Sequence, residues 1–274
     1  MSVVLITGCS SGIGRALADA FKAVGHEVWA TARKTADVET LAAAGFRAVE
    51  LDVNDRAAID RLAAQLEQHG KGLDVLINNA GYGGIGPLLD GGVEAMRRQF
   101  ETNVFSIVGV TRALFPLLRR NKALIVNIGS VSGVLTTPFG GAYCASKAAV
   151  SSLSDALRME LAPFGMRVME VQPGAIDTRF ATNAKHEAEQ VIHEGSAWWP
   201  LREGVRARAN ASQTHPTPAR NVARDVLNAV QKSNPPRLLR SGNGCRALPM
   251  MARLLPKALL ERILCKRFKL QGPL

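Results

Sequence analysis

The chain has 274 residues, 47% of them hydrophobic and only 5% aromatic, which suits one α/β domain with a sizeable core. Its four cysteines, Cys9, Cys144, Cys245 and Cys265, show neither metal-ligand nor redox spacing, so we expect no metal site and a reducing, cytoplasmic location. No segment has the pattern of a signal peptide or of a membrane-spanning helix.

The formal net charge of +11 lies in the C-terminal third of the chain. Residues 1–178 hold 17 basic and 17 acidic side chains, whereas residues 179–274 hold 17 basic and only 6 acidic ones. A basic balance can indicate a nucleic-acid or membrane partner. Here that interpretation applies to residues 179–274 alone.

Short apolar runs alternate with segments of helical periodicity from Val3 to Gln172. The pattern predicts strands at Val3–Thr7, His26–Thr31, Arg47–Asp52, Leu73–Asn78, Ala123–Ile128 and Arg167–Gln172. The helices expected between them run through Ile13–Val24, Val38–Leu41, Ile59–Leu66 with a cap at Asn54 or Asp55, Met96–Ile107, and Tyr143–Leu161. Such alternation calls for parallel strands joined by right-handed helical crossovers. We therefore expect an α/β fold, a single doubly wound Rossmann-like sheet with helices on both faces.

The periodicity weakens beyond Thr178. A polar, Arg-rich stretch carries Trp198-Trp199-Pro200, and a further helix is expected over Asn221–Gln231. Residues 247–270 mix apolar and basic side chains, with prolines that interrupt helices. No repeat, linker or low-complexity tract indicates a second domain, so residues 1–274 are expected to form one.

A glycine-rich turn follows the first predicted strand and opens the first helix. In this context backbone N–H groups and the helix dipole can receive a pyrophosphate. The residues expected to do so are Gly8, Ser10, Ser11, Gly12, Ile13 and Gly14. Their spacing differs from G-x-G-x-x-G, and a plain tight turn is the alternative.

The end of the second strand should decide which dinucleotide binds. A carboxylate there would hold the ribose 2′-hydroxyl, and a cation would hold a 2′-phosphate. The sequence reads Thr31-Ala32-Arg33-Lys34, without an acid, and Arg33 can clamp a phosphate with two hydrogen bonds. We therefore expect NADP(H) rather than NAD(H), unless Arg33 is simply a solvated surface residue.

The next two strand ends also face the expected ligand edge of the sheet. Asp52 and Val53 end the third strand, and Asp52 is a candidate contact for the adenine. The fourth ends in Asn78-Asn79-Ala80-Gly81, and Asn79, Ala80 and Gly81 suit a close backbone approach to a cofactor. A simple strand-ending turn explains this second motif equally well.

Tyr143, Lys147 and Ser130 form a candidate proton-transfer set. The tyrosine and the lysine lie one helical turn apart and so share a helix face. A free phenol has a pKa of about 10. A nearby ammonium and an oxidised nicotinamide would bring it closer to neutral pH, where general acid or base catalysis is effective. Ser130, which follows a buried strand, would orient the substrate with its hydroxyl group.

With these motifs in family order and spacing, the chain resembles the short-chain dehydrogenases/reductases from Val3 to Thr178. The resemblance also rests on Asn103 and on Pro173-Gly174 through Thr178. It implies that Ser130 holds the carbonyl oxygen, Tyr143 passes the proton, and Lys147 binds the nicotinamide ribose and depresses the phenol pKa. Asn103 would anchor a water of the proton relay. The nicotinamide would be cradled by Pro173, Gly174, Ile176 and Thr178.

Within this range the chain departs from the family pattern at Gly129, where many members carry a second serine. Beyond Thr178 the resemblance is looser. The C-terminal third is similar to that of NADP-preferring hydroxysteroid and retinol-type members, which implies a cofactor and catalytic body over 1–178, and a substrate lid and basic segment over 179–274. It also implies a homodimer or homotetramer built partly on helices around residues 90–120 and 143–161.

Several functions fit these observations. The leading hypothesis is an NADP(H)-dependent oxidoreductase that interconverts a carbonyl and an alcohol on a hydrophobic small molecule, such as a steroid, retinoid or lipid-like compound. Alternatives are an acyl-carrier-protein-linked 3-ketoacyl reductase and a non-catalytic dinucleotide-binding scaffold. We expect no nucleic-acid partner. Peripheral membrane contact through residues 247–274 is a further alternative, against which an ordinary solvated basic face is the simpler interpretation.

Overall fold

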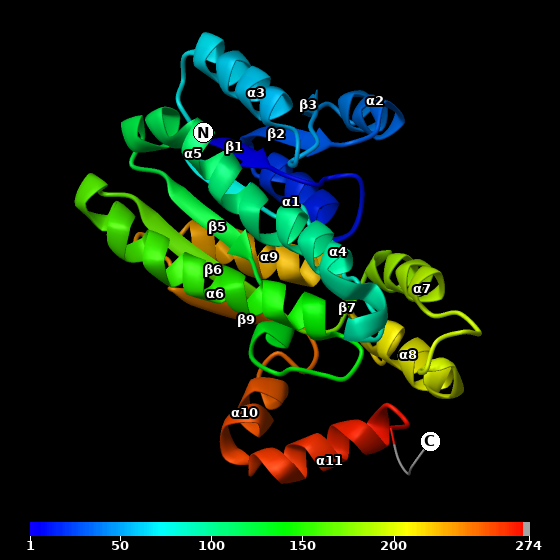
Figure 1. Cartoon of the computed structure of the whole chain (residues 1–274). Coiled ribbons are helices and arrows are strands. Elements are labelled where there is room, and N and C mark those ends of the chain that lie inside the picture. The colour runs from blue at the N-terminus through cyan, green and yellow to red at the C-terminus, as the bar shows by residue number, and fades with distance from the viewer. Residues whose placement is uncertain (271–274) are drawn as a thin grey trace.

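A computed structural model describes residues 1–270 of the chain. A seven-stranded parallel sheet lies at the centre of the molecule (Figure 1). The strand order is β3-β2-β1-β4-β5-β6-β9. The strands are β1 (Val3–Ile6), β2 (Glu27–Ala32), β3 (Arg47–Glu50), β4 (Val75–Asn78), β5 (Leu124–Ile128), β6 (Arg167–Pro173) and β9 (Leu238–Ser241). This confirms the predicted doubly wound sheet, to which the structure adds β9 as an edge strand.

Helices cover both faces of the sheet (Figure 1). One face is covered by α1 (Gly12–Ala23), α2 (Thr35–Ala43) and α9 (Ala219–Val230). The other is covered by α3 (Arg56–His69), α5 (Ser106–Arg120) and α6 (Gly141–Leu161), with α4 (Leu88–Phe100) leading into α5.

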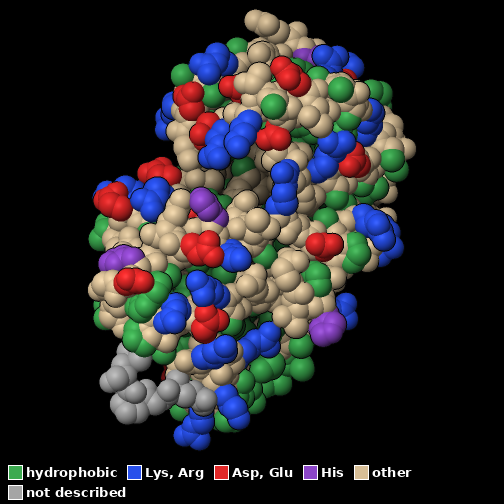
Figure 2. All heavy atoms as spheres, turned by 90° about the vertical axis from the view of Figure 1, so that its right-hand side faces the viewer, with side chains coloured by type: hydrophobic (Ala, Val, Ile, Leu, Met, Phe, Trp, Pro, Cys, Tyr) green, Lys and Arg blue, Asp and Glu red, His purple; other side chains and the backbone are tan. Residues whose placement is uncertain are grey.

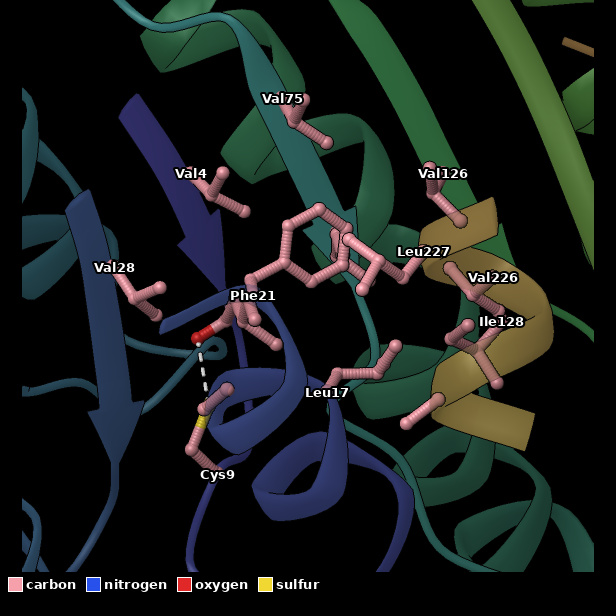
Figure 3. Close-up of a cluster of buried hydrophobic side chains, with 14 of the residues drawn as sticks. Val4, Cys9, Leu17, Phe21, Val28, Val75, Val126, Ile128, Val226 and Leu227 are labelled. Carbon is pink, nitrogen blue, oxygen red and sulfur yellow. Dashed lines mark hydrogen bonds between the residues drawn. The ribbon is translucent and has the colours of Figure 1, made fainter. Parts of the chain in front are cut away.

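The central strands β1, β4 and β5 are buried along their whole length and are mostly apolar, because helices cover both sides of them. Val4 and Ile6 of β1 belong to the cluster under α1 and α9, whereas Val3 and Leu5 belong to the cluster under α3 and α5. Figure 3 shows the first cluster, where Phe21 of α1 lies between the sheet and α9. The sheet is therefore held rigidly from both faces.

Local signals explain where two helices begin and end. The Asp55 side chain caps α3 by accepting a hydrogen bond from the Ala57 N–H at 2.9 Å, and Gly70 ends this helix at φ +79°. The predicted helix through Met96 and Ile107 is not one regular α-helix. It is α4, a π-helical turn over Glu101–Phe105, and then α5.

The C-terminal third contains more regular structure than its sequence pattern predicts. Its elements are β7 (Ile176–Asp177), α7 (Phe180–Val191), α8 (Arg202–Ala209), β8 (Thr217–Pro218), α9, β9, α10 (Ala247–Leu254) and α11 (Lys257–Arg267). Short 3-10 turns lie at Val131–Gly133, Ala162–Phe164, Trp199–Leu201 and Ala211–Gln213. A third hydrophobic cluster joins α7, α8 and α11 to the segment before α6. Within residues 1–270, no helix has the length and apolar character needed to cross a bilayer.

Candidate active site

The candidate site residues gather at the carboxyl edge of the sheet. Because β1, β4, β5 and β6 are parallel neighbours, the segments that follow them meet at one edge. Figure 2 shows the side of the molecule where α7 and α8 lie, and its surface is hollowed near the middle, with Lys and Arg side chains beside the hollow.

The glycine turn is bound tightly to the end of β4. Thr7 Oγ1 accepts hydrogen bonds from the Asn79 and Ala80 N–H groups, each at 3.0 Å. Asn79 Nδ2 donates to the carbonyls of Thr7 and Gly8, at 2.9 and 3.0 Å. In this structure, therefore, Asn79 and Ala80 hold the shape of the turn.

Gly14 shows why the turn needs glycines. A Cβ atom there would lie 2.2 Å from the Gly8 carbonyl oxygen and 2.4 Å from Asn79 Nδ2. Gly8 and Gly12 have φ values of +73° and +60°, which L side chains rarely adopt. Three glycines thus let the backbone fold closely at the start of α1.

The N-terminus of α1 is suited to a phosphate group. Ser11 is the N-cap residue but its side chain makes no capping hydrogen bond, and no acid lies in the first turn. The helix therefore presents uncapped N–H groups and the positive end of its dipole. A cleft of about 730 Å³ opens beside it, and its lining includes Arg15, Arg179 and Lys185. These residues fit the diphosphate of a dinucleotide, and the Ser10 carbonyl is held by Arg179 Nη2 at 3.0 Å.

Arg33 and Asp52 lie where the sequence places them. Arg33 follows β2 directly, is exposed, and forms no ion pair with any residue of 1–270. Asp52 and the buried Val53 follow β3, and Asp52 Oδ1 accepts a hydrogen bond from the Asn54 N–H at 2.9 Å. Their contacts with a nucleotide stay predictions.

Helix α6 positions Tyr143 and Lys147 one turn apart, and each side chain is buried. Ser130 stands at the start of the 3-10 turn that follows β5, where its Oγ accepts from the Ser132 N–H at 3.0 Å. The Ser130 hydroxyl also lies close enough to the Tyr143 phenol to lower its pKa. Gly133 permits this approach, because a Cβ there would lie 2.7 Å from the Lys147 carbonyl oxygen.

Burial governs the pKa values of both side chains. It raises the pKa of Tyr143, against the lowering effects of the Ser130 hydrogen bond and the Arg208 charge. It lowers the pKa of Lys147 to about 8, against the raising effect of Glu170. The Lys147 Nζ donates a hydrogen bond to the Ile128 carbonyl oxygen at 2.7 Å.

Asn103 joins this group through the π-helical turn. It is 1% exposed, its Oδ1 accepts from the Tyr82 N–H at 3.1 Å, and its Nδ2 donates to the Tyr82 carbonyl at 3.0 Å and to Ser146 Oγ at 3.1 Å. A Cβ atom at Gly81 would lie 3.0 Å from Asn103 Oδ1 and 3.8 Å from Lys147 Nζ. Gly81, Asn103 and Lys147 therefore lie together.

The segment from Pro173 to Thr178 closes the other side of the glycine turn. A Cβ at Gly12 would lie 3.1 Å from the Thr178 methyl carbon, so these two segments face each other. Gly174 has no room for a side chain, since a Cβ would lie 1.9 Å from the Asn243 carbonyl oxygen. Ile176 is buried and pairs with β8.

Two charged side chains beside Tyr143 and Lys147 were not predicted from the sequence. Glu170 carried one usable signal, because an acid inside a strand that is apolar on both faces needs a partner. Arg208 carried none, because it is one of several arginines in a stretch without clear periodicity.

Comparisons with known proteins agree with this geometry. A family model described as short chain dehydrogenase matches residues 2–189. The chain is 35% identical over 210 residues to the NADPH-dependent 1-acyldihydroxyacetone phosphate reductase of Schizosaccharomyces pombe, covering 76% of this chain and 71% of that protein.

Solved structures of the same kind match nearly the whole chain. A short-chain dehydrogenase from Streptomyces avermitilis has a TM-score of 0.80 and 31% identity, covering 98% of this chain and 96% of the other. One from Burkholderia cenocepacia, in complex with NADP, has a TM-score of 0.74 and 28% identity, covering 96% and 97%. A relative from Burkholderia phymatum, with a TM-score of 0.75, 25% identity and coverage of 100% and 97%, is in complex with NAD.

The matched family model covers more than half of the chain, and the matched structures share its sheet and its helices. The protein therefore belongs to the short-chain dehydrogenase/reductase family of oxidoreductases.

Proposed function

We propose that the protein reduces a carbonyl group on a hydrophobic small molecule with NADPH, or carries out the reverse oxidation. The observation that carries this proposal is the burial of Tyr143 and Lys147 one turn apart on α6, with Ser130 close enough to lower the pKa of the phenol. A bound nicotinamide would supply or accept the hydride. The residues of the chain would bind the substrate and move the proton.

In this mechanism the Ser130 hydroxyl holds the substrate oxygen and the Tyr143 phenol donates the proton to it. The raised pKa of Tyr143 keeps the phenol protonated, as a general acid must be before reduction. Lys147 binds the nicotinamide ribose and Asn103 anchors the water that returns a proton to the site. The turn around Gly8, Gly12 and Gly14 receives the diphosphate.

The tyrosine is the residue whose replacement tests this chemistry. Tyr143→Phe should lower kcat for carbonyl reduction by about 10²- to 10⁴-fold, because the general acid is lost. NADPH binding, followed by nucleotide fluorescence, should persist and show that the variant is folded. Turnover at the wild-type rate in Tyr143→Phe would refute the mechanism.

A preference for NADPH is supported by Arg33, an exposed cation without an ion-pair partner among residues 1–270. One relative is named NADPH-dependent and another is in complex with NADP, although a third is in complex with NAD. Arg33→Ala should raise the KM for NADPH by about tenfold and leave that for NADH unchanged, because only the former carries a 2′-phosphate. Equal effects on both nucleotides would remove the basis for the preference.

A hydrophobic substrate is supported by the apolar side chains around a small groove, of about 30 Å³, beside the candidate site. Its lining includes Ala142, next to Tyr143, and the apolar side chains of Ile85, Leu88, Met96 and Val191. Residues 179–208 contribute α7 and α8 to this side of the molecule, which suits a substrate lid. One relative is named for a reaction on an acyl-bearing phosphate compound, and a similar amphiphilic substrate would suit this chain.

We also propose that the protein forms a homodimer or homotetramer through α4, α5 and α6. Large apolar side chains are exposed in the single chain at Leu89 and Val93 of α4, Phe105 of the π-helical turn, Val108 of α5 and Met159 of α6. Light scattering after size exclusion measures the assembly. A monomer at micromolar concentration would contradict this proposal.

A further inference from the structure

Arg208 is a buried cation of α8 without an acidic partner among residues 1–270. Only 6% of the residue is exposed. Within residues 1–270, no carboxylate lies within ion-pair distance of its guanidinium, and its one side-chain hydrogen bond runs from Nε to Thr137 Oγ1 at 2.5 Å. Burying a charge without a counter-ion is costly, so such a side chain needs an explanation.

The guanidinium lies against the segment that leads into the Tyr143 helix. A Cβ atom at Gly140 would lie 3.1 Å from both Nε and Nη2 of Arg208, so the glycine makes room for the cation. Thr137, the hydrogen-bond acceptor, belongs to the same segment. The positive charge also lowers the pKa of the Tyr143 phenol, which means that the cation acts on the proposed general acid.

The unused donors of Arg208 are available to a ligand. Several buried polar atoms, such as Trp29 Nε1 and Thr31 Oγ1, are sealed from solvent without a partner, but no nitrogen of Arg208 is among them. Its terminal nitrogens have no hydrogen-bond partner in residues 1–270. They can therefore still donate.

A purely structural role explains only part of this arrangement. Tying α8 to Thr137 requires one donor, which a neutral glutamine would supply without the cost of a buried charge. A guanidinium offers a planar pair of donors that matches a carboxylate or phosphate with two parallel hydrogen bonds. The unused part of Arg208 is thus suited to an anion.

We infer that Arg208 binds an anionic group of the substrate, a carboxylate or a phosphate ester, while the carbonyl of the same molecule lies at Ser130 and Tyr143. This inference rests on the proposed function and narrows its substrate class to hydrophobic carbonyl compounds with one negative charge near the reacting carbon. Arg208 is then a substrate-binding residue that determines specificity.

Matched pairs of probes test this inference. One set is a series of aliphatic oxo-carboxylates with different chain lengths between the two groups, each paired with its methyl ester. The other is a series of ketones that end in a phosphate ester, each paired with the parent hydroxyketone. The wild-type enzyme should favour the charged member of one set by about 10- to 100-fold in kcat/KM, since hydrogen bonds to charged groups are strong.

Arg208→Met should abolish this preference, and Arg208→Lys should keep part of it. The ratio within a pair is the measured quantity, because any change at Tyr143 affects both members equally. Arg206→Met is the matched control, since Arg206 lies on the same helix but is exposed and paired with Glu203. It should leave the ratio unchanged.

Two outcomes would overturn the inference. One is a wild-type enzyme that treats charged and neutral members alike, and the other is an Arg208→Met variant whose ratio equals that of the wild type. Binding supplies a readout without turnover. Non-reducible alkyl carboxylates and alkyl phosphates should bind the NADPH complex of the wild type about tenfold more tightly than that of Arg208→Met. If that difference is found but no carbonyl compound is reduced, the proposed function fails and the anion site stands.

Discussion

At the scale of single residues, the buried side chain of Glu170 explains why a glycine stands at position 129, next to Ser130. The carboxylate of Glu170 is 5% exposed, and Oε1 accepts hydrogen bonds from Ser151 Oγ at 2.6 Å and Gln172 Nε2 at 3.0 Å. A Cβ atom at Gly129 would lie 2.5 Å from this oxygen. The glycine that replaces the second serine of many family members therefore leaves room for a buried acid beside Ile128, whose carbonyl accepts from Lys147.

Replacing Glu170 should shift the titration of Lys147. Burial lowers the lysine pKa to about 8 and the carboxylate opposes this lowering, so Glu170→Gln should lower the pKa further. The lysine is a cation only below its pKa. If it binds the ribose as a cation, NADPH affinity should fall as the pH rises through about 8 in the wild type, and at a lower pH in the variant.

Nucleotide titrations between pH 7 and 9.5 measure this effect. Glu160→Gln is the control. Glu160 is exposed and lies on α6, the helix that carries Lys147, so this variant should follow the wild-type curve. An identical pH dependence in Glu170→Gln and the wild type would show that the carboxylate does not influence the lysine.

Among the elements, the glycine turn at the start of α1 has the least tolerance for change. Gly14→Ala would place a methyl group 2.2 Å from the Gly8 carbonyl oxygen, so the turn would have to separate from α1 or from Asn79. We expect a loss of about 1–3 kcal/mol of unfolding free energy and NADPH affinity at least tenfold weaker, because the phosphate cradle is displaced.

Urea unfolding and nucleotide titration measure the two effects. Gly109→Ala in α5 is a matched control, because its nearest neighbour would be the Ile59 side chain at 3.9 Å. That variant should be stabilised by roughly 0.5–1 kcal/mol. Stabilisation by both substitutions would mean that Gly14 is not in close contact with Gly8.

The elements of the first two thirds were predictable because their limits have local causes. Asp55 and Gly70 bound α3, and two-sided burial makes β1 continuously apolar. The π-helical turn that carries Asn103 was not predictable, since its apolar spacing continues that of an α-helix. Strand β9 was missed because its four residues lie at the sheet edge and are mostly exposed, which removes the apolar pattern.

The candidate site likewise contains residues that the sequence could predict and residues that it could not. Tyr143, Lys147 and Ser130 belong to a motif with fixed spacing, and the structure brings them together. Glu170 and Arg208 act on them from β6 and α8, at sequence separations that only the tertiary fold closes. Long-range electrostatic partners of this kind have no local pattern to identify them.

At the scale of the whole molecule, hydrophobic contacts join the C-terminal third to residues 1–178. The third cluster brings Leu135 and Phe139, before α6, together with Val205 of α8, Leu264 of α11 and Phe268. On the face shown in Figure 2, the lower end of the molecule gathers apolar side chains beside Lys and Arg.

Replacing Phe268 should affect binding of the carbonyl substrate but not binding of NADPH. Phe268 is 3% exposed, and a Cβ atom at Gly204 would lie 2.1 Å from its carbonyl oxygen, so the end of α11 lies against α8. Phe268→Ala should lower the unfolding free energy by about 3 kcal/mol and loosen α8. The KM for the carbonyl substrate should rise several-fold, whereas the dissociation constant of NADPH, for which we propose binding at the glycine turn, should stay within twofold.

Leu254→Ala is the matched control, because Leu254 is 69% exposed on α10 and its removal opens no cavity. Steady-state kinetics with varied carbonyl substrate, combined with nucleotide fluorescence, distinguishes the two sites. A parallel loss of both affinities in Phe268→Ala would mean that the C-terminal helices support the whole sheet edge. A loss of affinity for the carbonyl substrate alone would show that α11 supports α8, the helix that carries Arg208.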